Sequence, residues 1–219
     1  FNKNKADTGS ALALHYINSI TIIVSYFIDN TNRNMKRGGV VFLQQPDKVH
    51  VFKCGFLKNR FGTIYVLFRS IVNPFNDSMV VMSSVFIKNV GTDGGGIYSD
   101  SCKHICLHSS VFKHNKCTRS GAGIFSIHSK QIEFKRLFFL KNFGRIGGAV
   151  SIQNCRNVTV ISTASYKNQA LLFGGGFHIT DSDNVKMIKT SIINNKGDFG
   201  GGLYITGFIG FLGIHLSLH

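Results

Sequence analysis

A repeat of 26 to 30 residues runs through most of the chain, and it restricts the possible folds more than any other feature. Seven asparagines recur at spacings of 29, 30, 26, 27, 26 and 27 residues: Asn30, Asn59, Asn89, Asn115, Asn142, Asn168 and Asn195. Two further columns of aliphatic residues keep nearly the same spacing, one through Ile97, Ile124 and Val150, the other through Ile105 and Ile132. Because three independent columns share one period, we expect a stack of similar structural units.

Each repeat has the pattern of three short β-strands. In one repeat, residues 96–99, 104–107 and 111–113 alternate apolar and polar side chains, and no helical period of 3.6 residues is sustained. Stacked units of this kind predict an all-β fold, a single-stranded right-handed parallel β-helix (solenoid) of about eight coils with 26–30 residues per coil. The right-handed sense follows from the crossover rule for parallel strands. The longer third coil predicts an insertion near residues 73–75.

Two columns are predicted to be structural. Asparagine tolerates the left-handed backbone of a sharp bend, and its amide can donate to and accept from neighbouring coils. Three residues before the asparagine, five repeats carry a phenylalanine that should stack inside a corner: Phe27, Phe56, Phe86, Phe112 and Phe139. Glycine clusters precede one strand in nearly every repeat. We expect them to permit close backbone stacking and positive φ rather than to bind a nucleotide.

The repeat divides the chain into an N-terminal segment (1–8), a parallel β-helix domain (9–206) and an irregular apolar tail (207–219). After Ile205 the tail holds no Asn, Asp or Lys, and it has three regularly spaced glycines. This pattern favours an imperfect or truncated end over a cap on the last coil. The apolar run at 208–218 is too short to span a bilayer as a helix, and residues 1–8 do not resemble a signal peptide. We expect the chain to be a piece of a longer protein.

Two repeated motifs carry a resemblance to a known family. One is Phe-x-x-Asn, as in Phe56–Asn59 and Phe112–Asn115, and the other is Gly-Gly followed by small and aliphatic residues, as in residues 147–150. Together they resemble the repeats of the chlamydial-type polymorphic outer membrane proteins, and similar right-handed β-helix repeats occur in surface proteins of the pectate-lyase-like superfamily. The resemblance covers about residues 9 to 206. It implies an adhesin-like, extracellular or cell-surface β-helix. The phenylalanine is lost at Ser165 and Ile192, and the family's C-terminal membrane barrel has no counterpart here.

Two outward columns are candidates for ligand binding. An aromatic column follows the glycine clusters and could stack on sugar rings or on apolar groups of a protein: Phe42, Tyr65, Tyr98, Phe125, His178 and Tyr204. Stacking of the rings on one another between coils is the structural alternative. A basic column precedes the asparagines: Lys58, Lys88, His114, Lys141 and Lys167. We call these five residues the basic ladder and the first six the aromatic column.

The chain has 25 Lys and Arg against 10 Asp and Glu, a formal net charge of +15. Two like charges separated by one strand spacing, about 4.8 Å, repel by about 0.9 kcal/mol in water, so stacked lysines must be solvated or paired with anions. An anionic polysaccharide or an acidic membrane surface is a reasonable partner, and a solubilising lysine stripe is the alternative. No recognised nucleic-acid module is present, so nucleic acid is not expected to bind.

Few residues are suited to catalysis or to metal binding. Hydrolases need two facing carboxylates, and the close acidic pair is Asp181 and Asp183, in a turn where aspartate also stabilises the bend. Cys102, His104, Cys106 and His108 alternate along one strand, which spreads them too widely for one zinc ion. No cofactor, metal or disulfide is predicted. The sequence therefore favours a non-enzymatic surface scaffold that binds carbohydrate or protein, with a polysaccharide lyase or glycoside hydrolase centred on Asp181 and Asp183 as the alternative.

Overall fold

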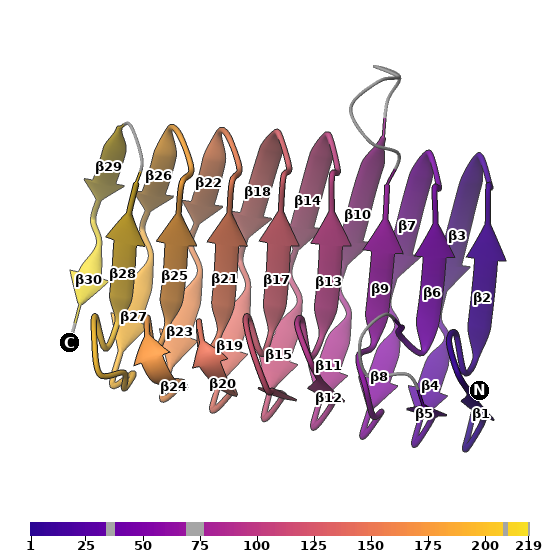
Figure 1. The fold of residues 1–219 in the computed structure, drawn as a ribbon. Coiled ribbons are helices and arrows are strands. Elements are labelled where there is room, and N and C mark those ends of the chain that lie inside the picture. Colours follow the sequence, from indigo (N-terminus) through magenta and orange to yellow (C-terminus); the bar gives the residue numbers. More distant parts are fainter. Residues whose placement is uncertain (34–37, 69–76, 208–209, 219) are drawn as a thin grey trace.

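The chain folds into a parallel β-solenoid of about seven turns (Figure 1). The computed structural model describes residues 1–33, 38–68, 77–207 and 210–218. Three parallel sheets of eight strands run along the solenoid, so that about seven turns of the chain separate the first strand of each sheet from its last. The described residues contain no helix, and hence no helix of the length and apolarity that crosses a membrane. The predicted all-β parallel β-helix is confirmed, while its right-handed sense stays a prediction.

The strands are numbered in chain order. The first sheet consists of β2 (Leu12–His15), β6 (Val41–Gln44), β9 (Ile64–Leu67), β13 (Ile97–Asp100), β17 (Ile124–Ile127), β21 (Val150–Gln153), β25 (Phe177–Thr180) and β28 (Leu203–Thr206). The second consists of β3 (Ser19–Ile23), β7 (Lys48–Phe52), β10 (Ser78–Met82), β14 (His104–His108), β18 (Gln131–Lys135), β22 (Val158–Ile161), β26 (Val185–Ile188) and β29 (Phe211–Ile214). The third consists of β4 (Tyr26–Ile28), β8 (Gly55–Leu57), β11 (Val85–Ile87), β15 (Val111–Lys113), β19 (Phe138–Leu140), β23 (Ala164–Tyr166), β27 (Ser191–Ile193) and β30 (Ser217–Leu218).

A fourth, shorter sheet was not predicted. It consists of β12 (Val90–Gly91), β16 (Lys116–Cys117), β20 (Phe143–Ile146) and β24 (Gln169–Phe173), and a two-stranded pair, β1 (Lys5–Ala6) and β5 (Thr31–Asn32), lies nearer the N-terminus. These strands belong to an arm that leaves the third sheet and returns to the first. Because the strands of this arm are short and lack clear alternation, the sequence pattern did not distinguish them from a loop.

The register of the sheets is the register that the repeat predicts. Ile97 pairs with Ile124, which pairs with Val150, and the Val49, Met79 and Ile105 column is equally aligned. Parallel pairing in one register converts each sequence column into a row of like side chains along the solenoid axis. Alternate residues of every strand therefore face the same interior, which explains why one repeat length is kept.

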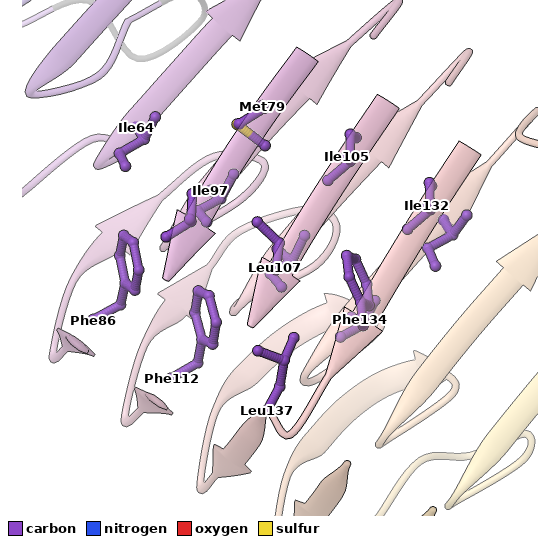
Figure 2. Packing of buried hydrophobic residues seen from close by; sticks show 14 of the residues in the cluster. Ile64, Met79, Phe86, Ile97, Ile105, Leu107, Phe112, Ile132, Phe134 and Leu137 are labelled. Atoms are coloured by element: carbon purple, nitrogen blue, oxygen red, sulfur yellow. The ribbon is translucent and has the colours of Figure 1, made fainter. Parts of the chain in front are cut away.

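The interior is filled by these rows (Figure 2). The five predicted phenylalanines are fully buried, and the four neighbouring pairs among them stack with ring centroids 4.7 to 5.1 Å apart. The spacing of parallel strands, about 4.8 Å, is also a favourable distance for offset stacking, worth roughly 0.5–1.5 kcal/mol per pair. Where Ser165 interrupts the row, the ring of Phe177 from the first sheet meets Phe139 edge-on at 6.0 Å. A larger residue in one row thus offsets a smaller residue in another.

The predicted asparagine ladder is present, and its details correct one part of the prediction. From Asn30 to Asn168, each asparagine donates from its backbone N–H and from Nδ2 to Oδ1 of the asparagine in the next coil. From Asn59 on, Nδ2 also donates to the carbonyl oxygen of the phenylalanine-column residue one coil earlier. The left-handed residue is not the asparagine, however, but the residue before it, with φ between 51° and 57°.

The other two bends follow the same rule. After the first sheet, left-handed residues such as His128 and Asn154 precede buried Ser129 and Cys155, and Ser129 N–H donates to Cys155 Sγ at 3.4 Å. After the second sheet, left-handed Ser83 precedes buried Ser84, whose hydroxyl accepts from a backbone N–H of the previous coil. Most bends therefore combine an exposed or half-buried left-handed residue with a buried residue that satisfies backbone groups, while a few, such as the bend at Leu137, hold a buried apolar residue instead. Cys54, Cys102 and Cys155 occupy such buried positions.

The glycine clusters have the two roles that were predicted. Gly121 has a φ of +63°, and a Cβ there would lie 2.1 Å from the carbonyl oxygen of Ile124. Gly123 has ordinary φ, but a Cβ would lie 2.7 Å from the carbonyl oxygen of Ala149 and 3.0 Å from the ring of Phe139. Positive φ and close stacking both require glycine here.

The described parts of the two terminal segments continue the stacked sheets. Within residues 1–8, β1 pairs with β5, and Phe1 stacks on Phe27 at 4.8 Å. Within the tail, β29 pairs with β26 and β30 with β27, in contrast to the predicted irregular structure. Parallel pairing uses backbone groups, so a strand forms here although the polar turn residues are missing. The insertion predicted near residues 73–75 lies outside the described residues.

Candidate functional site

The basic ladder lies at the bend between the third sheet and the arm. Each of its members has a left-handed backbone, with φ between 52° and 57°, and each precedes a buried asparagine. The four lysines are exposed and His114 is half-buried. Because the asparagine turns inward to its ladder, the residue before it is directed to solvent. One bend thus sets the same outward position in five successive coils.

Further cations surround the basic ladder. Lys113 ends β15, Lys116 begins β16, and Arg60 lies opposite Val90 in the arm. Lys88, Val90, His114 and Lys116 line a shallow recess between two coils. Burial lowers the pKa of His114, and the nearby lysines lower it further. In the described part of the chain, no member of the ladder takes part in an ion pair.

The choice of lysine at these positions is informative. A left-handed backbone favours Gly, Asn or Asp, and lysine has no conformational advantage there. The column itself contains Asp29 and Asn194 at its two ends, so the bend accepts the preferred residue types. Four lysines at these positions therefore indicate that the positive charge, rather than the bend, accounts for the residue type.

The aromatic column is aligned as predicted but is not an open face. Tyr65 and Tyr98 stack at 4.1 Å, and His178 and Tyr204 stack at 5.6 Å. Four of the six members, however, are buried: Phe42, Tyr65, Phe125 and His178 are 5 to 8% exposed. An external ligand cannot stack on rings that are covered, so these four residues form an inner packing layer, while Tyr98 and Tyr204 are half-buried. This corrects the predicted ligand-binding face.

The arm covers these rings. The positive-φ glycines of the arm lie close to the backbone of the column: a Cβ at Gly121 would lie 2.9 Å from Cα of Phe125, and one at Gly200 would lie 2.9 Å from Cβ of Tyr204. Phe173, in the arm, contacts Tyr204 at 4.8 Å and His178 at 6.1 Å. Burial lowers the pKa of His178 to about 4, so this ring is neutral at pH 7. The sequence showed that the column points away from the main core, but not that the arm folds back over it.

The two residues of the acidic pair, Asp181 and Asp183, have separate local roles. Asp181 is exposed and has a left-handed φ of 49° at the bend after the first sheet. Asp183 lies 4.0 Å from Nε of Arg156, and Ser182 between them is buried and donates to the carbonyl oxygen of Thr180. The bend-stabilising interpretation accounts for both residues, and the enzymatic alternative stays a prediction.

The cysteines and histidines of the second sheet spread as expected. His104, Cys106 and His108 face outward on β14, whereas Cys102 is buried at the preceding bend. All five thiols are free, and burial raises the pKa of Cys106 as well as that of the buried Cys102. The residues that the structure describes include no group of three or more His, Cys, Asp or Glu able to hold a metal ion.

The sequence interpretation missed a second basic column. Lys103, Lys130 and Arg156 are separated by 27 and 26 residues, so they occupy one position in three successive coils. The period alone could have revealed them, but they lie in turns whose residues were read only as bend formers. They line recesses beside the second sheet, which are described below.

Comparisons with known proteins do not extend these observations. No family model matches the chain, and neither the curated proteins nor the solved structures yield a match. Function must therefore be argued from the geometry of the surface.

Proposed function

We propose that this chain is a non-enzymatic scaffold that binds an anionic polysaccharide along the basic ladder. The observation that carries the proposal is the ladder itself: five successive coils present Lys58, Lys88, His114, Lys141 and Lys167 at one bend, outward and without an ion pair among the described residues.

The ladder is suited to a linear polyanion. Its charges are separated by one strand spacing, about 4.8 Å, in a straight row along the solenoid axis. A linear polymer with an acidic group on each sugar offers a matching row, and each contact relieves the repulsion between stacked lysines. Solenoids commonly bind along such extended faces. The formal charge of +15 adds long-range attraction for any anionic partner.

The same proposal includes the location of the protein relative to the cell. The Phe-x-x-Asn and Gly-Gly motifs resemble the repeats of the chlamydial-type polymorphic outer membrane proteins and of pectate-lyase-like surface proteins. On that resemblance we place the chain, wound in the right-handed sense, at the cell surface or outside the cell. There it would act as an adhesin-like module.

The test is titration with polygalacturonate, a linear uronic-acid polymer, at low and moderate salt. In the double variant Lys88→Asn and Lys141→Asn, two charges are lost while the left-handed bend is favoured. We expect its affinity to fall about tenfold or more at low salt, and the wild-type affinity to weaken as salt screens the charges.

The matched control is Lys53→Asn with Lys189→Asn. These lysines are also exposed and left-handed, but they lie at the bend after the second sheet. An equal loss of affinity in both double variants would mean that only net charge matters, and the proposed site would be wrong. Tighter binding of nucleic acid than of polygalacturonate would reject the polysaccharide, and release of unsaturated or reducing products from the polymer would show an enzyme instead.

A further inference from the structure

We propose a second, separate binding site beside the second sheet, for a sugar that carries a phosphate or sulfate ester. Three adjoining recesses lie along β14, β18 and β22, and neighbouring recesses share lining residues. The largest has a volume of about 340 Å³, at the small end of the range of roughly 300–1,000 Å³ typical of small-molecule sites. Together the three recesses form a groove that starts at the bend after the first sheet and continues onto the second sheet, whereas the basic ladder lies at the bend after the third.

One end of this groove is cationic. Lys130 and Arg156 line two of the three recesses, and His128 joins them at the outer end. Lys130 and Arg156 occupy the same position in adjacent coils, about 4.8 Å apart along the axis. Arg156 has a nearby carboxylate, but Asp183 is 4.0 Å away and the two side chains are 75% and 44% exposed, so the pair is weak. An oxyanion with several oxygens can contact both cations together.

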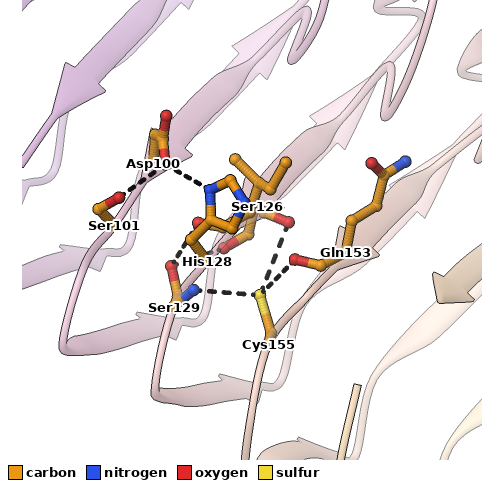
Figure 3. Close-up of polar contacts among 8 residues, drawn as sticks. Asp100, Ser101, Ser126, His128, Ser129, Gln153 and Cys155 are labelled. Carbon is orange, nitrogen blue, oxygen red and sulfur yellow. Dashed lines mark hydrogen bonds and ion pairs between the residues drawn. The ribbon is translucent and has the colours of Figure 1, made fainter. Parts of the chain in front are cut away.

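The wall of this cationic end is held in place by polar contacts (Figure 3). His128 Nδ1 donates to Asp100 Oδ1 at 3.1 Å, which ties the imidazole to the preceding coil. Ser129 donates from its backbone N–H to Cys155 Sγ at 3.4 Å, and its hydroxyl accepts from Ser126 Oγ at 3.2 Å. Lys130 therefore directly follows a bend that is held by hydrogen bonds to the preceding coil and to the following coil. Preorganisation of this kind reduces the entropic cost of binding.

Beyond this end the groove is lined by uncharged polar residues together with His104, Cys106 and two isoleucines, and Glu133 is its acidic residue. Gln131 and Asn157 lie in the middle, and Asn157 Oδ1 accepts from Nδ2 of Asn184 at 3.1 Å, which orients its own Nδ2 as a donor. Thr159 and Glu133 lie at the inner end. Amides, a hydroxyl and a carboxylate are the groups that hydrogen-bond sugar hydroxyls.

The order of these groups selects the ligand. A polyanion would bring acidic groups next to Glu133, where like charges repel. A ligand that is anionic at one end and hydroxylated at the other avoids this repulsion and uses both ends of the groove. Phosphate and sulfate esters share this chemistry, with charged oxygens that suit Lys130 and Arg156.

The experiment is calorimetric titration of the whole chain with inorganic phosphate, glucose 6-phosphate, glucose 6-sulfate and glucose. We expect saturable binding of the two esters, tighter than that of inorganic phosphate, and about a tenfold or greater weakening for glucose. The stronger of the two esters identifies the source of the anion. The variant Lys130→Gln should weaken ester binding about fivefold or more, while Lys135→Gln, at the C-terminal end of the strand β18 that begins directly after Lys130, should change it less than about twofold.

A second variant separates this site from a general effect of charge. Glu133→Gln should strengthen the binding of inorganic phosphate, because a negative charge is lost, but should reduce the preference for the sugar ester, because an acceptor for hydroxyls is weakened. Equal effects of Lys130→Gln and Lys135→Gln, no saturable binding of either ester, or an unchanged preference in Glu133→Gln would each overturn the proposal. The ladder variant Lys88→Asn with Lys141→Asn should leave ester binding unchanged.

Discussion

Removal of one asparagine side chain from the middle of the ladder should destabilise the solenoid strongly. Asn115 is fully buried; its Oδ1 accepts from the backbone N–H and from Nδ2 of Asn89, both at 3.0 Å. Its Nδ2 donates to the carbonyl oxygen of Phe86 at 2.9 Å and to Oδ1 of Asn142 at 3.1 Å. If the Asn115 side chain is removed, Asn142 Oδ1 still accepts from the backbone N–H of residue 115, a bond that measures 2.9 Å.

Asn115→Ala therefore leaves two donors on Asn89, its backbone N–H and one Nδ2–H, without a partner, and removes one donor from the carbonyl of Phe86. Each buried group left unsatisfied costs roughly 1–3 kcal/mol, so the free energy of unfolding should fall by about 2–6 kcal/mol. Native domains have a total of only about 5–15 kcal/mol, so this loss is large. The measurement is urea unfolding followed by circular dichroism, with hydrogen exchange at the amide of Asn89 as a local readout.

The matched control is Asn4→Ala. Asn4 is exposed, its Nδ2 donates to Asn30 Oδ1 at 2.9 Å, and Asn30 Oδ1 still accepts from the backbone N–H of residue 4 at 3.0 Å. Loss of one exposed hydrogen bond should cost about 1 kcal/mol or less. If the two variants are equally stable, or if exchange at Asn89 is not accelerated in Asn115→Ala, the reasoning about buried partners is refuted.

Three further predictions concern packing, pH and thiols. Gly123→Ala should lose about 1–3 kcal/mol in urea unfolding, because the new methyl group meets a carbonyl at 2.7 Å and the ring of Phe139 at 3.0 Å; Gly202→Ala, whose nearest neighbour is a side-chain methyl at 3.1 Å, should lose clearly less. Burial lowers the pKa of His178 to about 4, below the unfolded value of about 6.5, so the unfolded state binds more protons between these values and stability should fall as the pH drops from about 6.5 to about 4. Thermal melts across that range should show a smaller fall in His178→Phe, and an identical fall would exclude this residue as the cause. Of the five thiols, only Cys106 is not buried, so a thiol reagent should label one cysteine per chain before unfolding, and rapid labelling of several would contradict the described burial.

The sequence predicted the sheets well because a parallel solenoid forces its strands into register. The 26- and 27-residue spacings of Ile97, Ile124 and Val150 could be kept only if those residues paired, and they do. The asparagine and phenylalanine columns were predictable for the same reason, since a repeated residue in such a stack necessarily contacts its own kind.

What could not be predicted depends on contacts between different parts of one turn. The aromatic column lies outside the main core, and only the path of the arm decides that Phe125 and His178 are covered. The left-handed residue of the third bend was misassigned because asparagine has the stronger preference for that backbone, yet the Asn115 amide is needed inside and His114 takes the left-handed position instead. Local preference and ladder bonding compete there, and the buried hydrogen bonds prevail.

This competition also explains where a solenoid of this kind can carry specificity. The buried residue of most bends is constrained, because its amide, hydroxyl or thiol bonds backbone groups of neighbouring coils. The left-handed residue before it contacts solvent and is not required to hydrogen-bond backbone groups of neighbouring coils. Its residue type can therefore vary without loss of the fold. At the third bend this position holds mainly lysine, whereas at the first bend it holds His128, Asn154 and Asp181 in turn. A row that keeps one residue type along the solenoid suits a repeating polymer. A row whose residue type changes from coil to coil suits a compact ligand with distinct ends. The two proposed sites differ in this respect: Lys141→Asn should weaken binding of the polymer, whereas Asn154→Lys, which adds a cation beside Lys130 and Arg156, should strengthen binding of the ester.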